Sequence, residues 1–169
     1  HSCAGLQQVK LPYGLRHILN DTFLDCTSLT AVVIPDTVEK INIQDFKNCS
    51  SLVRVQMPLA LTNIYYAAFY GCKSLQYIDL PDEVKYIGGF AFGECQNIQT
   101  VELPKAVTVI ASKVFYNCTN LTEVKLSKFT SSIGVQAFYG CANLKELNLP
   151  STIEKIDLGA FENSGLMEL

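Results

Sequence analysis

A period of 23 residues constrains this chain more than any other feature of its sequence. Cysteine and phenylalanine each occur seven times at this interval. The cysteines are Cys3, Cys26, Cys49, Cys72, Cys95, Cys118 and Cys141, and the phenylalanines are Phe23, Phe46, Phe69, Phe92, Phe115, Phe138 and Phe161. Proline follows the same period, except that Ser127 stands at one of its places. A unit this short cannot bury an apolar side by itself, so copies of it must stack on one another.

Each unit also contains a predicted strand. Apolar residues stand three, six and eight positions after the cysteine, as in Leu29, Val32 and Ile34. This alternation is typical of a half-buried strand, and the proline that follows ends it by removing a backbone donor. We therefore expect one parallel sheet, formed by residues 8–11, 31–34, 54–57, 77–80, 100–103, 123–126 and 146–149.

The residue before each cysteine indicates a corner of the chain. At six of the seven places it is Gly, Asn or Asp, the residues that enter a left-handed backbone at least cost. Six of the seven stand before a cysteine, namely Asp25, Asn48, Gly71, Glu94, Asn117 and Gly140, and the seventh, Asn163, holds the equivalent place in the last unit. A turn of the chain is thus predicted once per unit.

Composition limits the class of protein. The chain has 169 residues, a net charge of −3, 49% hydrophobic residues and 17% charged residues, which is typical of a folded globular protein. No cluster of Lys and Arg is large enough to track phosphates, so no nucleic-acid partner is expected. No apolar run reaches the roughly 20 residues of a membrane helix, so no membrane insertion is expected. The chain opens with HSCAGL, without an initiating Met or a signal peptide, and we interpret it as a piece of a longer protein.

The pattern LxxVxLPxxVxxIxxxAFxxC resembles the BspA-like leucine-rich repeats of bacterial surface proteins. The clearest copies are SLQYIDLPDEVKYIGGFAFGEC and NLKELNLPSTIEKIDLGAF. The resemblance implies an α/β solenoid over residues 1–169, a single domain. It would be a right-handed superhelix of about seven units, with a parallel sheet on the concave face and mostly short strands and turns on the other side. It also implies an extracellular or cell-surface location, protein partners that are often host proteins, and no cofactor or shared catalytic residue.

One unit departs from the pattern. Ser127 replaces the proline, and Thr130 stands where the other units have an apolar residue. Because local stability follows buried apolar contact, we expect this unit to be the weak point of the stack.

The cysteines are not expected to carry chemistry. Equivalent residues on neighbouring strands lie about 4.8 Å apart with parallel side chains, whereas a disulfide needs Cβ atoms about 3.8 Å apart. A ladder also cannot converge on one zinc ion. A catalytic thiol needs a base. Of the two histidines of the chain, His1 is terminal, and His17 is expected to face solvent because it stands beside the inward Ile18. We therefore predict seven reduced, buried thiols, no metal site and no enzyme.

The outward residues of the predicted sheet are the candidate binding surface. Their N-terminal half is apolar to basic, and their C-terminal half is acidic. The candidate partner-binding residues are Tyr77, Asp79, Glu102, Glu123 and Glu146. They predict a basic protein partner, although an ordinary solvated face fits the same residues. Carboxylate pairs also occur in glycoside hydrolases, but no pocket here is expected to raise the pKa of an acid.

The function that these observations favour is a protein-binding or adhesion module. The alternative is a structural spacer that holds another domain away from the cell. Three exposed tyrosines, Tyr65, Tyr66 and Tyr86, could add a second recognition surface, while Tyr70, Tyr116 and Tyr139 share one repeat position and predict a structural ladder. Asp45 stands at an inward position and is expected to make a local backbone hydrogen bond.

Overall fold

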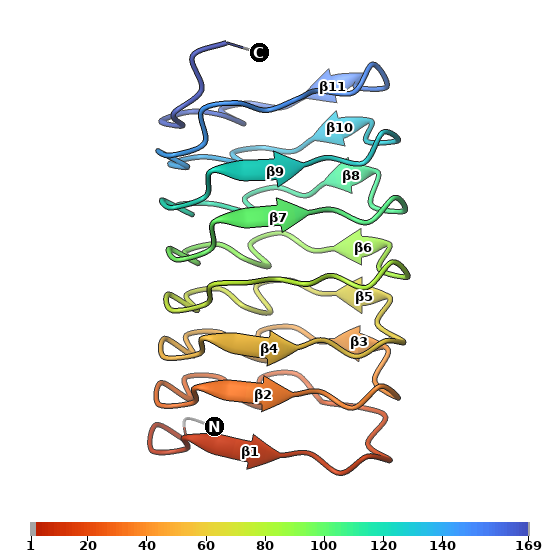
Figure 1. Cartoon of the computed structure of the whole chain (residues 1–169), viewed down its shortest axis with the longest axis vertical. Helices are drawn as coiled ribbons and strands as arrows, with labels where there is room; N and C mark the ends of the chain where they lie inside the picture. The colour runs from red at the N-terminus through yellow and green to blue at the C-terminus, as the bar shows by residue number, and fades with distance from the viewer. Residues whose placement is uncertain (1–2, 169) are drawn as a thin grey trace.

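Each 23-residue unit forms one turn of a stacked coil in the computed structural model, which describes residues 3–168 (Figure 1). Successive turns lie one above another from the N-terminus to the C-terminus, and strands on two sides of the stack run in opposite directions (Figure 1). Residues 3–168 contain short strands and turns but no helix, so the α/β description was wrong. The physical reason is that every unit contains two residues with left-handed backbone, and such residues interrupt a right-handed helix.

The first ladder of strands corresponds to the predicted sheet. β1 (Gln8–Lys10), β2 (Ala31–Val33) and β4 (Arg54–Gln56) form one parallel sheet, and β7 (Thr100–Glu102) and β9 (Glu123–Lys125) form another. The register pairs each residue with the one 23 positions later, as in Val9 with Val32 and Val32 with Val55. We call the outward side of this ladder the front face; its expected concavity stays a prediction.

Two of the seven expected strands are not formed. Residues 77–80 and 146–149 continue the stack without strand pairing, which divides the ladder between β4 and β7. The amide of Ile34 donates to the carbonyl of Gln56 at 3.1 Å, and that of Leu103 to Lys125 at 3.0 Å. Within residues 3–168 the amide of Leu80 makes no such bond. Burial still alternates in this segment, so inward packing rather than a backbone ladder holds it in place.

A second ladder lies behind the first (Figure 1). It consists of two-residue parallel strands: β3 (Lys40–Ile41), β5 (Asn63–Ile64) and β6 (Tyr86–Ile87) in one sheet, and β8 (Val109–Ile110), β10 (Ser132–Ile133) and β11 (Lys155–Ile156) in another. These are the short strands expected on the other side of the solenoid. They begin five residues after the proline position, and their second residue is a buried isoleucine in every strand except β11, where Ile156 is exposed.

The core between the two ladders is a set of identical residues stacked at the period of the repeat. The phenylalanine rings stack nearly parallel, with centroids 5.1 Å apart from Phe23 to Phe46 and 5.7 Å apart from Phe138 to Phe161. From Leu29 onward, the leucines three residues after the cysteines, such as Leu52 and Leu75, are fully buried. Each such side chain contributes about 1.5–3 kcal/mol of burial free energy before the entropy of ordering the chain is subtracted.

Two corners turn the chain in every unit, and the sequence indicated only one of them. The predicted corner is confirmed, since all seven residues before the cysteines or their equivalents have φ between 54° and 73°. A second left-handed residue precedes each of them by four positions. These are Asp21, Gln44, Ala67, Phe90, Lys113, Gln136 and Gly159, with φ between 52° and 63°. Their side chains share no chemistry, so no compositional signal identified them.

Side chains at the predicted corner form a ladder with a three-unit pattern. Asn48 donates from Nδ2 to Asp25 Oδ1 at 2.8 Å, and a Cβ added at Gly71 on the next turn would meet Asn48 Oδ1 at 2.6 Å. The order of acid, asparagine and glycine recurs 69 residues later. There Asn117 donates to Glu94 at 2.8 Å, and Gly140 stands on the next turn. Glycine is therefore required at the third place by contact as well as by its left-handed backbone.

The irregular unit keeps its turn but leaves one polar group unsatisfied. Ser127 Oγ donates to the carbonyl of Lys105 at 2.9 Å and accepts from the amide of Phe129 at 3.2 Å, so the serine takes part in hydrogen bonds that a proline could not make. Thr130 is fully buried, and its Oγ1 has no hydrogen-bond partner among residues 3–168. An unpaired buried hydroxyl costs about 1–3 kcal/mol.

Replacing this hydroxyl by a methyl group should stabilise the protein. Thr130→Val keeps the shape of the side chain and removes the unpaired group, so we expect the free energy of unfolding to rise by about 1–2 kcal/mol in urea denaturation. Thr122→Val is the matched control, because the exposed Thr122 Oγ1 donates to the carbonyl of Gln99 at 3.0 Å and its loss should give no gain. Equal stability of Thr130→Val and the parent chain would show that the hydroxyl is satisfied in solution.

Candidate protein-binding face

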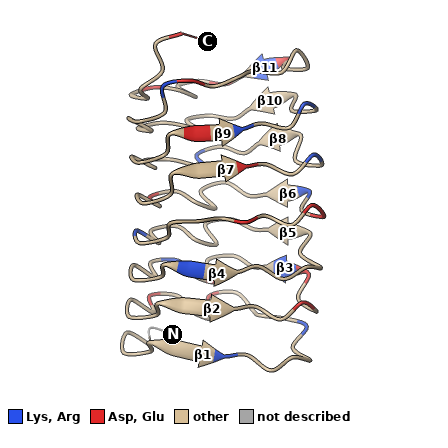
Figure 2. Ribbon diagram, in the orientation of Figure 1, with Lys and Arg blue, Asp and Glu red and all other residues tan. Residues whose placement is uncertain are grey.

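The front face exposes the outward residues of the first ladder as a row of mostly polar side chains. Figure 2 shows acidic residues gathered toward β7 and β9, and basic residues on β1 and β4. All five sequence-predicted site residues are exposed there, with Tyr77 at 65%. The predicted asymmetry of charge between the two halves of the face is thus present in the structure.

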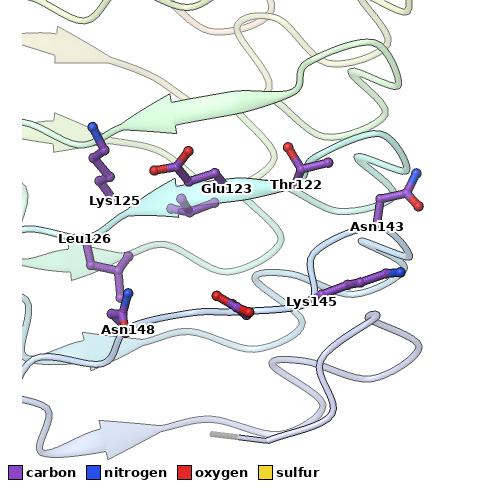
Figure 3. Close-up of a pocket in the computed structure, with 9 residues that line it drawn as sticks. Thr122, Glu123, Lys125, Leu126, Asn143, Lys145 and Asn148 are labelled. Atoms are coloured by element: carbon purple, nitrogen blue, oxygen red, sulfur yellow. The ribbon is translucent and has the colours of Figure 1, made fainter.

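These five residues do not meet in one site. Glu123 and Glu146 line an open pocket over β9, drawn in Figure 3. Asp79 and Glu102 line a second pocket toward β7, together with Lys105 and Lys128. Tyr77 lines a third hollow that contains neither of these carboxylate pairs. The structure therefore brings the acids together in pairs, while Tyr77, two residues before Asp79 in the chain, lines a hollow with uncharged residues.

Lysines weaken the acidic field that the sequence predicted. Lys125 Nζ lies 3.3 Å from Glu102 Oε2 on the neighbouring turn, and both side chains are largely exposed. Such a surface pair contributes at most about 1 kcal/mol to stability, but it cancels one unit of charge on this part of the face. Lys145 also lines the pocket of Glu123 and Glu146 (Figure 3). The carboxylates without an ion pair on this face are Asp79, Glu123 and Glu146 among the described residues.

The face offers charge and contact area. Its carboxylates stand in open, solvent-filled pockets, which do not provide the apolar surroundings that a general acid requires. Among residues 3–168, no three His, Cys, Asp or Glu side chains converge as metal ligands would. His17 is exposed, as expected.

The cysteine ladder has a hydrogen-bonding role that the sequence did not reveal. Each buried thiol from Cys49 to Cys141 donates from Sγ to the carbonyl of the phenylalanine 26 residues earlier, at 3.1 Å. Burial raises the pKa of Cys49 and Cys141 to about 12, and it also raises the pKa of Cys72 well above its ordinary value. All seven thiols are free, as predicted. Cys3 is exposed, however, so its expected burial was wrong, because no preceding turn covers it within the described residues.

Alkylation should distinguish Cys3 from the other cysteines. The thiolate is the nucleophile, and burial with a raised pKa keeps the inner thiols protonated and inaccessible. Iodoacetamide at pH 8 should add one label to the native chain, on Cys3, and seven labels after denaturation, counted by mass spectrometry. Two or more labels on the native chain would show that the stack opens in solution.

Asp45 is a buried carboxyl in the core. Its Oδ2 accepts a hydrogen bond from the amide of Asn42 at 2.7 Å, as the sequence predicted, while Oδ1 has no partner among residues 3–168. Burial raises the pKa of Asp45 from 3.8 to about 7, and the Asn42 amide lowers it by less. The charge of Asp21 adds to the increase. The folded chain therefore favours the protonated acid.

This shift makes stability depend on pH. The pKa of Asp45 is higher in the folded chain than in the unfolded one. Its contribution to the free energy of unfolding is therefore complete below about pH 4 and is lost as the pH rises toward 7, by up to roughly 1.4 kcal/mol per pH unit. Urea denaturation at pH 5 and pH 8 should show the parent chain less stable at pH 8. In Asp45→Asn, which cannot ionise, this difference should be smaller. An unchanged difference in the variant would assign the effect to other groups.

The remaining aromatic residues form clusters on the side of the stack. Tyr116 and Tyr139 stack with centroids 4.9 Å apart, and Phe90 packs edge-on against Tyr70 at 5.7 Å. The predicted tyrosine ladder therefore holds for one pair, while Phe90 lies between Tyr70 and Tyr116. Tyr65 and Tyr86 pack together at 5.7 Å. Tyr66 also touches Phe90, so these tyrosines serve packing at least in part.

A family of leucine-rich repeat proteins accounts for this stacked geometry. The family model of the BspA type leucine-rich repeat region matches residues 1–73 and 44–168, in six copies. The chain belongs to this family of repeat proteins. The count of six copies leaves the expected seven units unconfirmed. No curated protein matches the chain significantly. Within residues 3–168, no helix has the length and hydropathy needed to cross a bilayer.

Solved structures of bacterial leucine-rich repeat proteins share the fold. A leucine-rich repeat protein of T. pallidum is 32% identical, with a TM-score of 0.85, over 94% of this chain and 73% of that one. One from Bacteroides ovatus is 28% identical, with a TM-score of 0.79, over 88% of this chain and 45% of that one. One from Eubacterium ventriosum is 26% identical, with a TM-score of 0.67, over 85% and 45%. The chain thus spans less than half the length of the last two proteins.

Proposed function

We propose that this chain is a protein-binding module, a single solenoid domain within a longer bacterial surface or secreted protein. The family supports this proposal, because BspA-like leucine-rich repeats are repeats of bacterial surface proteins. The observation that carries the proposal is the row of exposed carboxylates on the front face, at Asp79, Glu102, Glu123 and Glu146. The bound partner would be an extracellular protein with a basic surface, and binding would serve adhesion.

A stacked coil is well suited to this task. Its front face is fixed by the buried core and by backbone bonds between turns, so little ordering free energy is lost when a partner binds. Charge of one sign on part of the face speeds the encounter with an oppositely charged partner more than it tightens the complex. The pair of Lys125 and Glu102 reduces that charge, so Asp79, Glu123 and Glu146 provide most of the field.

Three charge-removing substitutions test the proposal. Glu102→Gln, Glu123→Gln and Glu146→Gln are combined in one variant, and binding is measured by surface plasmon resonance against a panel of purified basic extracellular proteins. For any protein that binds the parent chain, we expect that high salt weakens this binding. The same protein should associate more slowly with the variant than with the parent chain. Circular dichroism should show an unchanged fold, because all three side chains are exposed.

The matched control removes the same charge elsewhere. Glu39, Glu83 and Glu154 are exposed but lie outside the front strands, so their combined change to Gln should leave the association rate unaltered. Equal rates for the front-face variant and the parent chain would contradict the proposal. In that case, or if no protein of the panel binds, the structural spacer becomes the better account of the chain.

A further inference from the structure

One hollow on the front face has a different chemistry from the carboxylate pockets. It lies where the ladder of strands is interrupted at residues 77–80, and its lining residues all carry no charge. They are Gln76, Tyr77, Asn97, Gln99 and Asn120. These residues come from three successive turns of the coil, so the hollow extends along the stack. An aromatic ring and four primary amides therefore surround one space.

The ring of Tyr77 is free to contact a ligand. It is 65% exposed and stacks on no other aromatic ring among the described residues. Tyr116, by contrast, is covered by Tyr139 at 4.9 Å. An exposed aromatic side chain provides large contact area at low entropic cost, since only two torsions must be fixed. Nothing in the packing of the stack requires an aromatic residue at this position.

Two of the amides beside the ring, those of Asn97 and Asn120, belong to a ladder of asparagines along the stack. Asn120 donates from Nδ2 to Asn97 Oδ1, and Asn143 donates to Asn120 Oδ1, each at 3.4 Å and each across 23 residues. The ladder ends at Asn97, whose own Nδ2 makes no hydrogen bond to the described residues. The free Nδ2 of Asn97 therefore lies at the end of the ladder that is nearer to the turn of Tyr77. The row presents both donors and acceptors along the axis of the coil.

We propose that this hollow binds a neutral carbohydrate chain. A sugar ring has an apolar face of C–H groups, which packs on an aromatic ring, and hydroxyl groups that both donate and accept hydrogen bonds, as amides do. A phosphate-bearing or sulfated ligand would need Lys or Arg in the lining, and none is present. Asp79, two residues after Tyr77 and exposed on the same face, would repel such an anion. This proposal does not rest on the protein partner proposed above.

Affinity electrophoresis tests the proposal directly. The whole chain is run in native gels with and without a dissolved neutral polysaccharide, using a mannan, a galactan, a β-glucan and starch in turn. At least one should slow its migration, and the dissociation constant from the retardation should rise about tenfold or more in Tyr77→Ala. Asn97→Ala should weaken binding by about threefold or more through the lost donor. Both side chains are exposed, so both variants should fold.

Two controls separate a specific site from general stickiness. Tyr77→Phe keeps the ring and should bind nearly as the parent does. Tyr13→Ala removes a tyrosine outside the hollow that is even more exposed, at 86%, and should have no effect. Retardation should not change between about 0.05 and 0.5 M salt, nor in the variant with Glu102, Glu123 and Glu146 changed to Gln. The proposal is overturned if no polysaccharide of the panel retards the chain, or if Tyr77→Ala is retarded as strongly as the parent.

Discussion

The stacking of each turn on an identical neighbour is the interaction on which the rest of the structure depends. It aligns the phenylalanine rings 5.1–5.9 Å apart, and it places each buried thiol from Cys49 to Cys141 3.1 Å from a phenylalanine carbonyl. The thiol is small enough to fit between turns and can donate to a carbonyl that would otherwise face the apolar core. An inward cysteine at this place therefore combines apolar burial with a weak hydrogen-bond donor. Alanine would lack the donor, and serine would be less favourable to bury.

The same period sets what the corners must be. The backbone of each 23-residue turn enters the left-handed region twice, and each such entry by a residue other than glycine is disfavoured. The stack tolerates Ala67 and Phe90 there because backbone bonds to the next turn, such as Ala67 to Gly89 at 3.0 Å, hold both in place. At the other corner, the side chains of Asn48 and Asn117 also donate to the turn below, to Asp25 and Glu94.

The outward positions are free of these constraints, and function is to be sought there. The core repeats the same residues from turn to turn, whereas the front face changes from basic to acidic along the stack (Figure 2). Local groups on that face divide into charged pockets around Glu123 and Asp79 and an uncharged hollow around Tyr77. A rigid repeat can therefore present more than one kind of binding surface, each on a few neighbouring turns.

The sequence by itself determined the period, the inward residues, the parallel register and one corner of each turn. These follow from spacing and burial, which are local properties repeated seven times along the chain. Only the tertiary structure showed the second corner, because Asp21, Gln44 and Phe90 share a backbone conformation but no side-chain chemistry. It alone also paired Lys125 with Glu102 and placed Tyr77 in a hollow lined by uncharged residues. Those outcomes depend on which side chains meet across 23 residues, and no pattern within a single unit specifies that.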